Sequence, residues 1–179
     1  MGRIYLAIFF LAITGILGFT GWGFISLQTP GGSATFLHIP VLLTALLGGL
    51  PEGILAGVIF ALSAWFKFPL FPLMHFPGRI LAPVLAWLIY QGGKKVFAGI
   101  SRAGQIFLSA LLASLTGSLV NTWLTLGIGL WTAQFTISQL RHIWNSQGRA
   151  ELIFGISIIT PTVVVWELLR KKKKAEPGR

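Results

Sequence analysis

The sequence predicts an all-α, polytopic membrane protein: one domain over residues 1–179, folded as a bundle of six transmembrane helices. Two observations support this fold class. Hydrophobic residues make up 54% of the chain and charged residues only 10%, and the mean hydropathy of +0.79 is well above that of a soluble domain. The apolar residues also form long runs that are separated by short segments rich in Gly, Pro and charge.

The apolar runs define the expected spans. The first run is long enough to cross a hydrocarbon core of about 30 Å at about 1.5 Å per residue, although a cleaved signal peptide is the alternative. The next two runs form a hairpin divided by Pro51, and its first half spans only about 18 Å as a helix, so it is either a short crossing or part of a re-entrant dip. Spans are expected at about 4–27, 38–50, 51–66, 79–91, 104–131 and 150–169. The Pro-rich segment 67–77 and the polar segment 132–149 are expected to be loops.

Charge predicts the orientation of these spans. Six crossings place both termini on one side of the membrane. Of the 14 Lys and Arg residues, only Lys67, Arg79, Arg141 and Arg149 then fall on the other side. Because cytoplasmic segments carry the excess of positive charge, both termini are expected in the cytoplasm. The terminal basic run is then a topology anchor that touches the lipid bilayer, and no nucleic-acid partner is expected.

Composition and motifs exclude several classes of protein. There is no Cys and no Asp, and the acidic residues are four Glu, so thiolate metal sites and clusters of Asp ligands cannot form. No P-loop, H-E-x-x-H or G-x-S-x-G pattern is present. We therefore expect no enzyme activity, no ATPase motif, no metal and no cofactor.

Small residues recur on two of the expected helices. Thr14 and Gly18 form a small-x3-small pair on the first, and Gly53, Gly57 and Ala61 form a stripe on the third. Such stripes let membrane helices approach closely, which predicts an interface with a partner subunit. The alternative is that the stripe packs only against helices of this chain.

Polar residues gather at the ends of the spans that are expected to face outward. Ionisable groups at membrane depth tend to line a cavity or a pathway. The alternatives are snorkelling for Arg79, a helix-dipole position for Glu151 and an interhelical hydrogen bond for Asn121. The candidate substrate-binding residues are His38, Arg79, Asn121, Trp123, Trp144 and Glu151.

Four stretches resemble one transporter family in their order and spacing. They are FLHIPVLLTALLGGLPEGILAGVIFALS (36–63), PGRILAPVLAWLIY (77–90), TGSLVNTWLTLG (116–127) and QGRAELIFGISIITPTVVVWELLRK (147–171). The set resembles the substrate-binding S components of energy-coupling factor (ECF) transporters, which import vitamins. Gln147 stands where the family usually has Asn, Arg149 is an unusual basic residue, and the first helix lacks a clean A-x3-A motif.

The resemblance implies a subunit in a bacterial cytoplasmic membrane that captures a water-soluble vitamin or related micronutrient on its outer face. It implies docking to a transmembrane T subunit that two ABC ATPases drive. Loops 1, 3 and 5 would close the pocket. Arg79 favours an anionic, pantothenate-like solute, because guanidinium groups match carboxylates and phosphates. The alternative from another class is a membrane scaffold or sensor module without small-molecule cargo.

Overall fold

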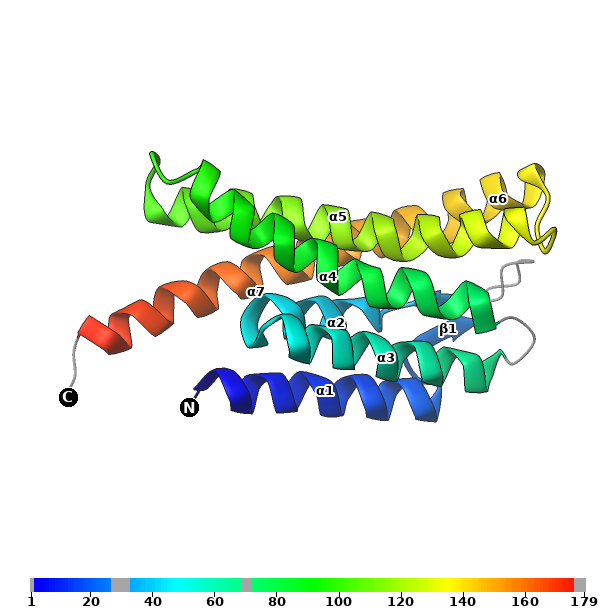
Figure 1. The fold of residues 1–179 in the computed structure, drawn as a ribbon, viewed down its shortest axis with the longest axis horizontal. Coiled ribbons are helices and arrows are strands. Elements are labelled where there is room, and N and C mark those ends of the chain that lie inside the picture. The colour runs from blue at the N-terminus through cyan, green and yellow to red at the C-terminus, as the bar shows by residue number, and fades with distance from the viewer. Residues whose placement is uncertain (1, 27–32, 69–71, 176–179) are drawn as a thin grey trace.

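The computed structural model describes residues 2–26, 33–68 and 72–175, and it is built almost entirely of helices (Figure 1). In chain order the elements are α1 (Gly2–Thr20), β1 (Phe24–Ser26), β2 (Ser33–Thr35), α2 (His38–Leu43), the π-helical η1 (Thr44–Gly48), α3 (Leu50–Lys67), α4 (Pro72–Val96), α5 (Arg102–Trp131), α6 (Ile137–Ile143), the π-helical η2 (Trp144–Gly148) and α7 (Arg149–Ala175). The helix α2 runs into η1, and α6 runs through η2 into α7. The helical elements therefore form six continuous rods. The all-α prediction is confirmed.

The first helix is shorter than the expected span 4–27. It ends at Thr20, and Gly21 follows with a φ of +81°, a backbone conformation that favours glycine. Phe24–Ser26 then pairs antiparallel with Ser33–Thr35, with Phe24 opposite Thr35. The sequence analysis did not anticipate this β-hairpin, because strands of three residues leave no periodic pattern. Residues 27–32, which include the last residue of the expected span 4–27, lie outside the described part of the chain.

Two of the expected loops are largely helical. The helix α4 begins at Pro72 rather than Arg79 and contains Pro77 and Pro83, so proline in the segment 67–77 did not exclude a helix. In the expected loop 132–149, α6 begins after Thr136, whose hydroxyl accepts from the Gln139 N–H while the Gln139 side chain accepts from the Thr136 N–H. This capping box starts a rod that continues into α7.

The small-residue faces pack the helices of this chain together. A Cβ on Gly18 would lie 2.5 Å from the Ser63 hydroxyl of α3, and one on Gly53 would lie 2.5 Å from the Ala45 Cβ of η1. Gly57 lies against the backbone carbonyl of Arg79 in α4. Thr14 and Ala61 are fully buried. The expectation that these five residues face a partner is therefore corrected: in this structure they are covered by the protein's own helices, which is the alternative named above.

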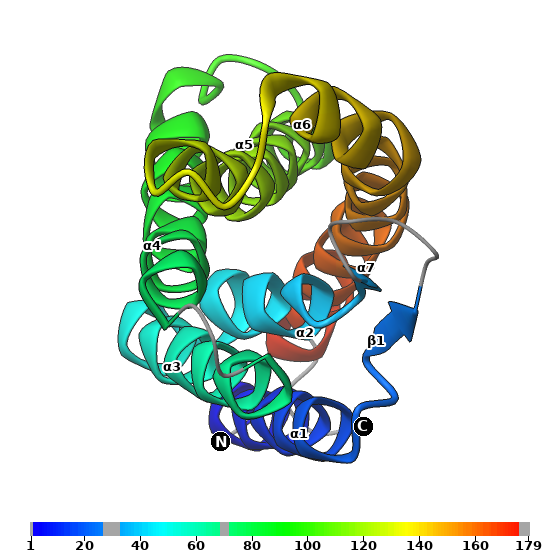
Figure 2. The same ribbon diagram turned by 90° about the vertical axis from the view of Figure 1, so that its right-hand side faces the viewer.

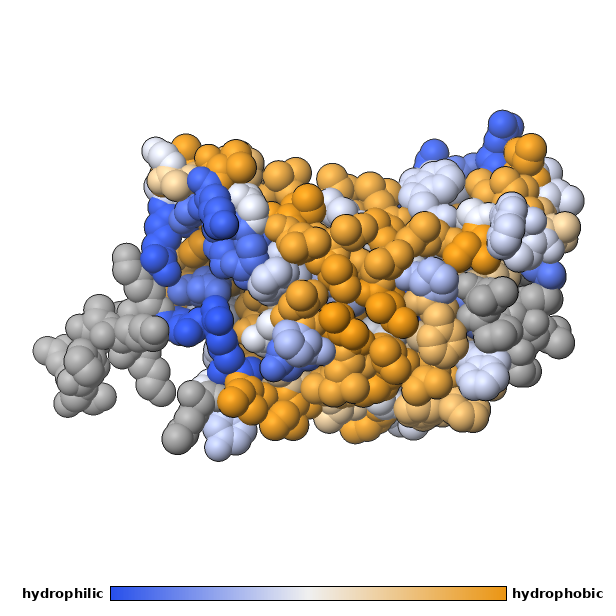
Figure 3. Space-filling model, in the orientation of Figure 1, coloured by the Kyte–Doolittle hydropathy of each residue, from blue (hydrophilic) through white to orange (hydrophobic). Residues whose placement is uncertain are grey.

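The bundle has two polar ends and an apolar middle (Figure 3). The start of α1, the end of α4, the start of α5 and the end of α7 meet at one end, which carries Arg3, Lys94, Arg102 and Arg170 and is called the basic end (Figure 1). The β-hairpin and α6 lie at the other, the hairpin end. By length and composition, four helices of the described chain are apolar enough to cross a membrane: Gly2–Thr20, Leu50–Lys67, Arg102–Trp131 and Ile137–Arg170.

Candidate functional site

Buried polar side chains converge at the hairpin end from five elements. Viewed from this end, α4, α5, α6, α7 and α2 surround a central region (Figure 2). On or beside these elements lie buried residues that include His38, His75, Arg79, Asn121, Thr122, Gln147 and Glu151. Polar groups are costly to bury unless they are bonded or bind a ligand, so this cluster is the candidate site.

Glu151 joins three distant parts of the chain. Its Oε1 accepts from the backbone N–H of Thr35 in β2 at 2.7 Å, and its Oε2 accepts from the Thr122 hydroxyl of α5 at 3.0 Å. Thr35 in turn donates its hydroxyl to the Gly23 carbonyl. Both carboxylate oxygens therefore tie the β-hairpin and α5 to the first turn of α7. Among the described residues Glu151 forms no ion pair with Arg79.

His38 is fixed by backbone carbonyls. Its Nδ1 lies 2.9 Å from the Thr35 carbonyl oxygen and its Nε2 lies 3.1 Å from that of Glu151. A neutral imidazole carries one N–H, so it donates to one of these two carbonyls. With 1% of its surface exposed, His38 joins the start of α2 to β2 and α7 and forms part of the wall of the site.

Within the described part of the chain, Arg79 is a buried cation that forms no ion pair with an acidic side chain. Its Nη1 donates to His75 Nδ1 at 2.7 Å and to the His75 carbonyl at 2.9 Å, one helical turn earlier in α4. Its guanidinium carbon lies 4.5 Å from the centre of the Phe60 ring, a cation–π contact with α3. The residue is 7% exposed, and its Nε–H has no hydrogen-bond partner among the described residues. A charged donor is thus held in place with unused bonding capacity.

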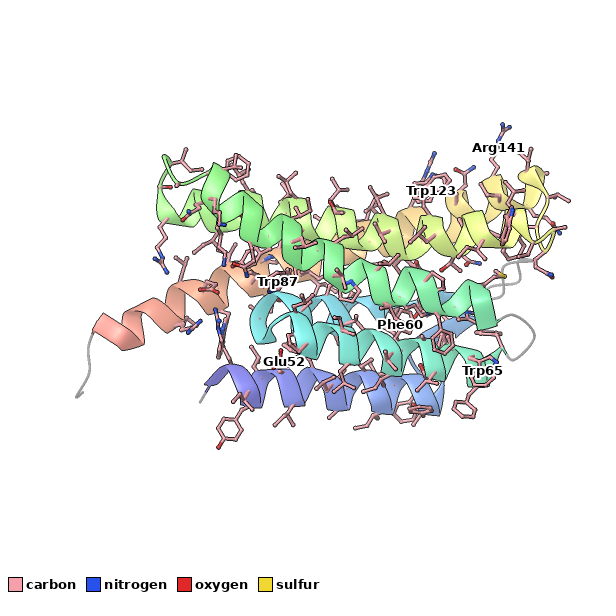
Figure 4. All side chains as sticks on the ribbon, viewed as in Figure 1. Glu52, Phe60, Trp65, Trp87, Trp123 and Arg141 are labelled. Atoms are coloured by element: carbon pink, nitrogen blue, oxygen red, sulfur yellow. The ribbon has the colours of Figure 1, made fainter. Side chains whose placement is uncertain are left out.

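The other predicted site residues divide into two groups. Asn121 is 5% exposed on the buried face of α5, and its backbone carbonyl accepts from Thr125. Trp123 and Trp144 instead pack against each other with their rings tilted by 36° and the ring centres 4.8 Å apart, and Trp123 is 44% exposed. Trp123 points outward from the bundle, as Arg141 does (Figure 4). The exposed Trp123 ring therefore lies on the outer side of α5, and the half-buried Trp144 ring packs against it.

The structure adds four residues to the site that the sequence analysis did not select. They are Thr35, His75, Thr122 and Gln147, all of them buried. His75 lies four residues before Arg79, a spacing that brings two side chains together once the segment is known to be helical. Thr35 carries no such signal, because its partner Glu151 is 116 residues away. Within the described chain, no group of three or more His, Cys, Asp or Glu could hold a metal ion.

Comparison with known protein families shows the family to which the chain belongs. A family model described as the substrate-specific component of ECF transporters matches residues 4–170. The chain belongs to this family. No match was found among curated proteins. The match covers nearly the whole bundle and confirms the resemblance noted from the sequence.

As an S component, the chain is a substrate-binding transport subunit and not an enzyme. It is a multi-pass membrane protein. Membership also implies association with the T subunit and ATPases of an ECF module. The buried cluster at the hairpin end is the candidate binding site for that substrate.

Proposed function

We propose that this S component captures an anionic, water-soluble vitamin or related micronutrient at the hairpin end, with a pantothenate-like carboxylate as the favoured class. The observation that carries the proposal is Arg79. Its guanidinium is buried, where it donates to the His75 ring nitrogen and lies over the uncharged Phe60 ring. Its Nε–H has no hydrogen-bond partner among the described residues. A desolvated cation that forms no ion pair within the described chain attracts an anion strongly.

The surroundings favour the same sign of charge. Lys67, Arg141 and Arg149 are exposed at or near the hairpin end and add positive potential around its opening. The side-chain amide of Asn121, on the buried face of α5, offers a neutral hydrogen-bond donor and acceptor. We assign contact with the solute to Arg79 and Asn121, and assign to Glu151 and His38 the task of holding the β-hairpin against the site.

In this proposal the hairpin end faces the outside of a bacterial cytoplasmic membrane and the basic end faces the cytoplasm. The start of α1 and the end of α7 both lie at the basic end (Figure 1). The excess of Lys and Arg at this end favours the cytoplasmic side of the membrane. The T subunit would approach the flank of α1 and α3, whose exposed residues are large and apolar, among them Ile8, Phe9, Leu55 and Phe66.

The test of function is identification of the solute. The protein is purified from cells in detergent, denatured, and the released small molecules are identified by mass spectrometry. We expect a vitamin-like molecule with a carboxylate or phosphate, which should rebind to the emptied protein with quenching of tryptophan fluorescence. A neutral or cationic solute would remove the argument for an anion. Absence of any solute, together with no rebinding across a panel of vitamins, would favour the scaffold or sensor function.

The test of orientation uses single cysteines, because the chain has none of its own. Ser146 and Ser101 are both exposed, at the hairpin end and beside the basic end respectively. A membrane-impermeant maleimide should label Ser146→Cys in intact cells and Ser101→Cys only after the cells are opened. The reverse pattern would overturn the orientation and leave the site itself untouched.

A further inference from the structure

A second polar region lies at the opposite end of the molecule from the substrate site. A cleft of about 290 Å³ opens at the basic end between α1, α4, α5 and α7. Its lining residues are Arg3, Lys94, Arg102, Gln105, Ile106, Glu167 and Arg170. Four of these side chains are cationic and one is anionic. The proposed uptake of a solute at the hairpin end makes no use of this cleft.

Contacts within the chain hold several of these groups in place. The Lys94 ammonium lies 4.3 Å from the centre of the Tyr90 ring, which is fully buried below it. The Gln105 side-chain amide donates to the Lys94 carbonyl and joins the end of α4 to the start of α5. Arg3 lies 3.7 Å from Glu167 and joins α1 to α7. The cleft is thus assembled from all four helices.

The positive charge of the cleft is not balanced inside it. Glu167 is engaged by Arg3, and within the described chain Lys94, Arg102 and Arg170 form no ion pair. The Tyr90 hydroxyl beneath Lys94 has no hydrogen-bond partner there either. Several cations around one concave space, with few acceptors of their own, attract an anion that offers several oxygen atoms.

We infer that this cleft binds a phosphate group. Arg forks and a Lys ammonium together match the oxygen atoms of a phosphate better than a single carboxylate. The cleft lies where the apolar body of the bundle ends (Figure 3), and exposed apolar residues such as Ile4, Val96 and Ile100 lie close by in the sequence. The headgroup of an anionic phospholipid is the source that this position favours, and free phosphate is the other source.

The experiment measures lipid retention on the whole protein. The purified protein is stripped of lipid, placed in nanodiscs of phosphatidylcholine with or without phosphatidylglycerol, and analysed by native mass spectrometry. The parent should retain phosphatidylglycerol in preference to phosphatidylcholine. The double variant Lys94→Gln/Arg102→Gln should weaken this binding by about 30-fold, at roughly fivefold for each charge removed near the headgroup. Glu167→Gln should strengthen it, because it frees Arg3.

Lys95→Gln is the matched control, since Lys95 is exposed next to Lys94 but does not line the cleft. It should change retention by less than about twofold. An equal effect of Lys95→Gln and of the double variant would overturn the inference, because binding would then follow surface charge alone. So would a parent that shows no preference for phosphatidylglycerol and no thermal stabilisation by inorganic phosphate. Stabilisation by inorganic phosphate without a lipid preference would support the phosphate site and assign it to a soluble ligand.

Discussion

The two ends of the bundle hold charge in opposite ways. At the basic end the ion pair between Arg3 and Glu167 is partly in water, with the Arg3 side chain 48% exposed. At the hairpin end Arg79 and Glu151 are each 7% exposed and are bonded to neutral groups rather than to each other. Exposed charge near a membrane surface contributes little to stability and serves orientation and surface binding. Buried charge held by neutral partners either fixes the fold, as for Glu151, or is available to a ligand, as we propose for Arg79.

The largest expected effect tests Arg79 as the ligand group. Arg79→Ala should weaken binding of the identified solute by about 2–5 kcal/mol, roughly 30- to 5000-fold, because it removes a desolvated charge from the anion. Calorimetric titration measures the affinity, and a thermal melt checks the fold. Arg141→Ala removes an exposed arginine from the same end and should change affinity by less than about threefold. Equal affinity in the parent and a folded Arg79→Ala variant would remove Arg79 from the site.

The next comparison concerns the stability lost when Glu151 at the hairpin end or Glu167 at the basic end is replaced by Gln. Glu151→Gln keeps the size of the side chain but weakens two charge-assisted hydrogen bonds, to Thr35 and Thr122, and should lower the free energy of unfolding by about 1.5–3 kcal/mol. Glu167→Gln removes the partly exposed pair with Arg3 and the weaker attraction of Glu167 for the nearby Lys94, and should cost about 0–1 kcal/mol. Thermal unfolding in detergent measures both. Similar losses for the two variants would contradict the distinction between the ends.

The third comparison concerns two glycines, at which substitution by alanine should have effects of opposite sign. A Cβ on Gly57 would collide with the Arg79 carbonyl and lie 3.3 Å from the Ile80 Cα, so Gly57→Ala should push α3 from α4 and destabilise by about 1–3 kcal/mol. Gly92, near the basic end of α4, has nothing within 4 Å of such a Cβ. Gly92→Ala should stabilise by up to about 1 kcal/mol through helix propensity. If Gly57→Ala melted no lower than the parent, the close contact beneath Arg79 would not matter to the fold.

Much of the fold could be predicted from the sequence because apolar runs dominate it. The hairpin divided by Pro51 is an example: Gly49 turns the chain between η1 and α3, and Pro51 lies in the first turn of α3. The two wrong predictions concern segments in which a loop signal and a helix-start signal occur together. Proline in 67–77 predicts a loop, but Pro is also tolerated at a helix start, where α4 places Pro72. The polarity of 132–149 predicts a loop as well, but the capping box of Thr136 and Gln139 within it starts a helix.

The site was harder to predict than the helices. Polar groups are rare at membrane depth, which marks Arg79, Asn121 and Glu151 as candidates, and the structure buries all three at one end. Trp123 and Trp144 were selected for their size, which does not indicate the side of a helix on which a ring lies. The small-residue stripe of Gly53, Gly57 and Ala61 showed that two surfaces meet closely but not whether the second surface belongs to another chain.

The bond between Thr35 and Glu151 also has a consequence for the order in which the protein is made. Their 116-residue separation means that the ribosome, at about 5–20 residues per second, completes the second partner roughly 6–23 seconds after the first. Throughout that interval the β-hairpin has emerged without the carboxylate that anchors its backbone. A chain arrested before residue 151 would hold its early helices and an unanchored hairpin. The candidate site is therefore a late product of synthesis, completed only when the final rod enters the bundle.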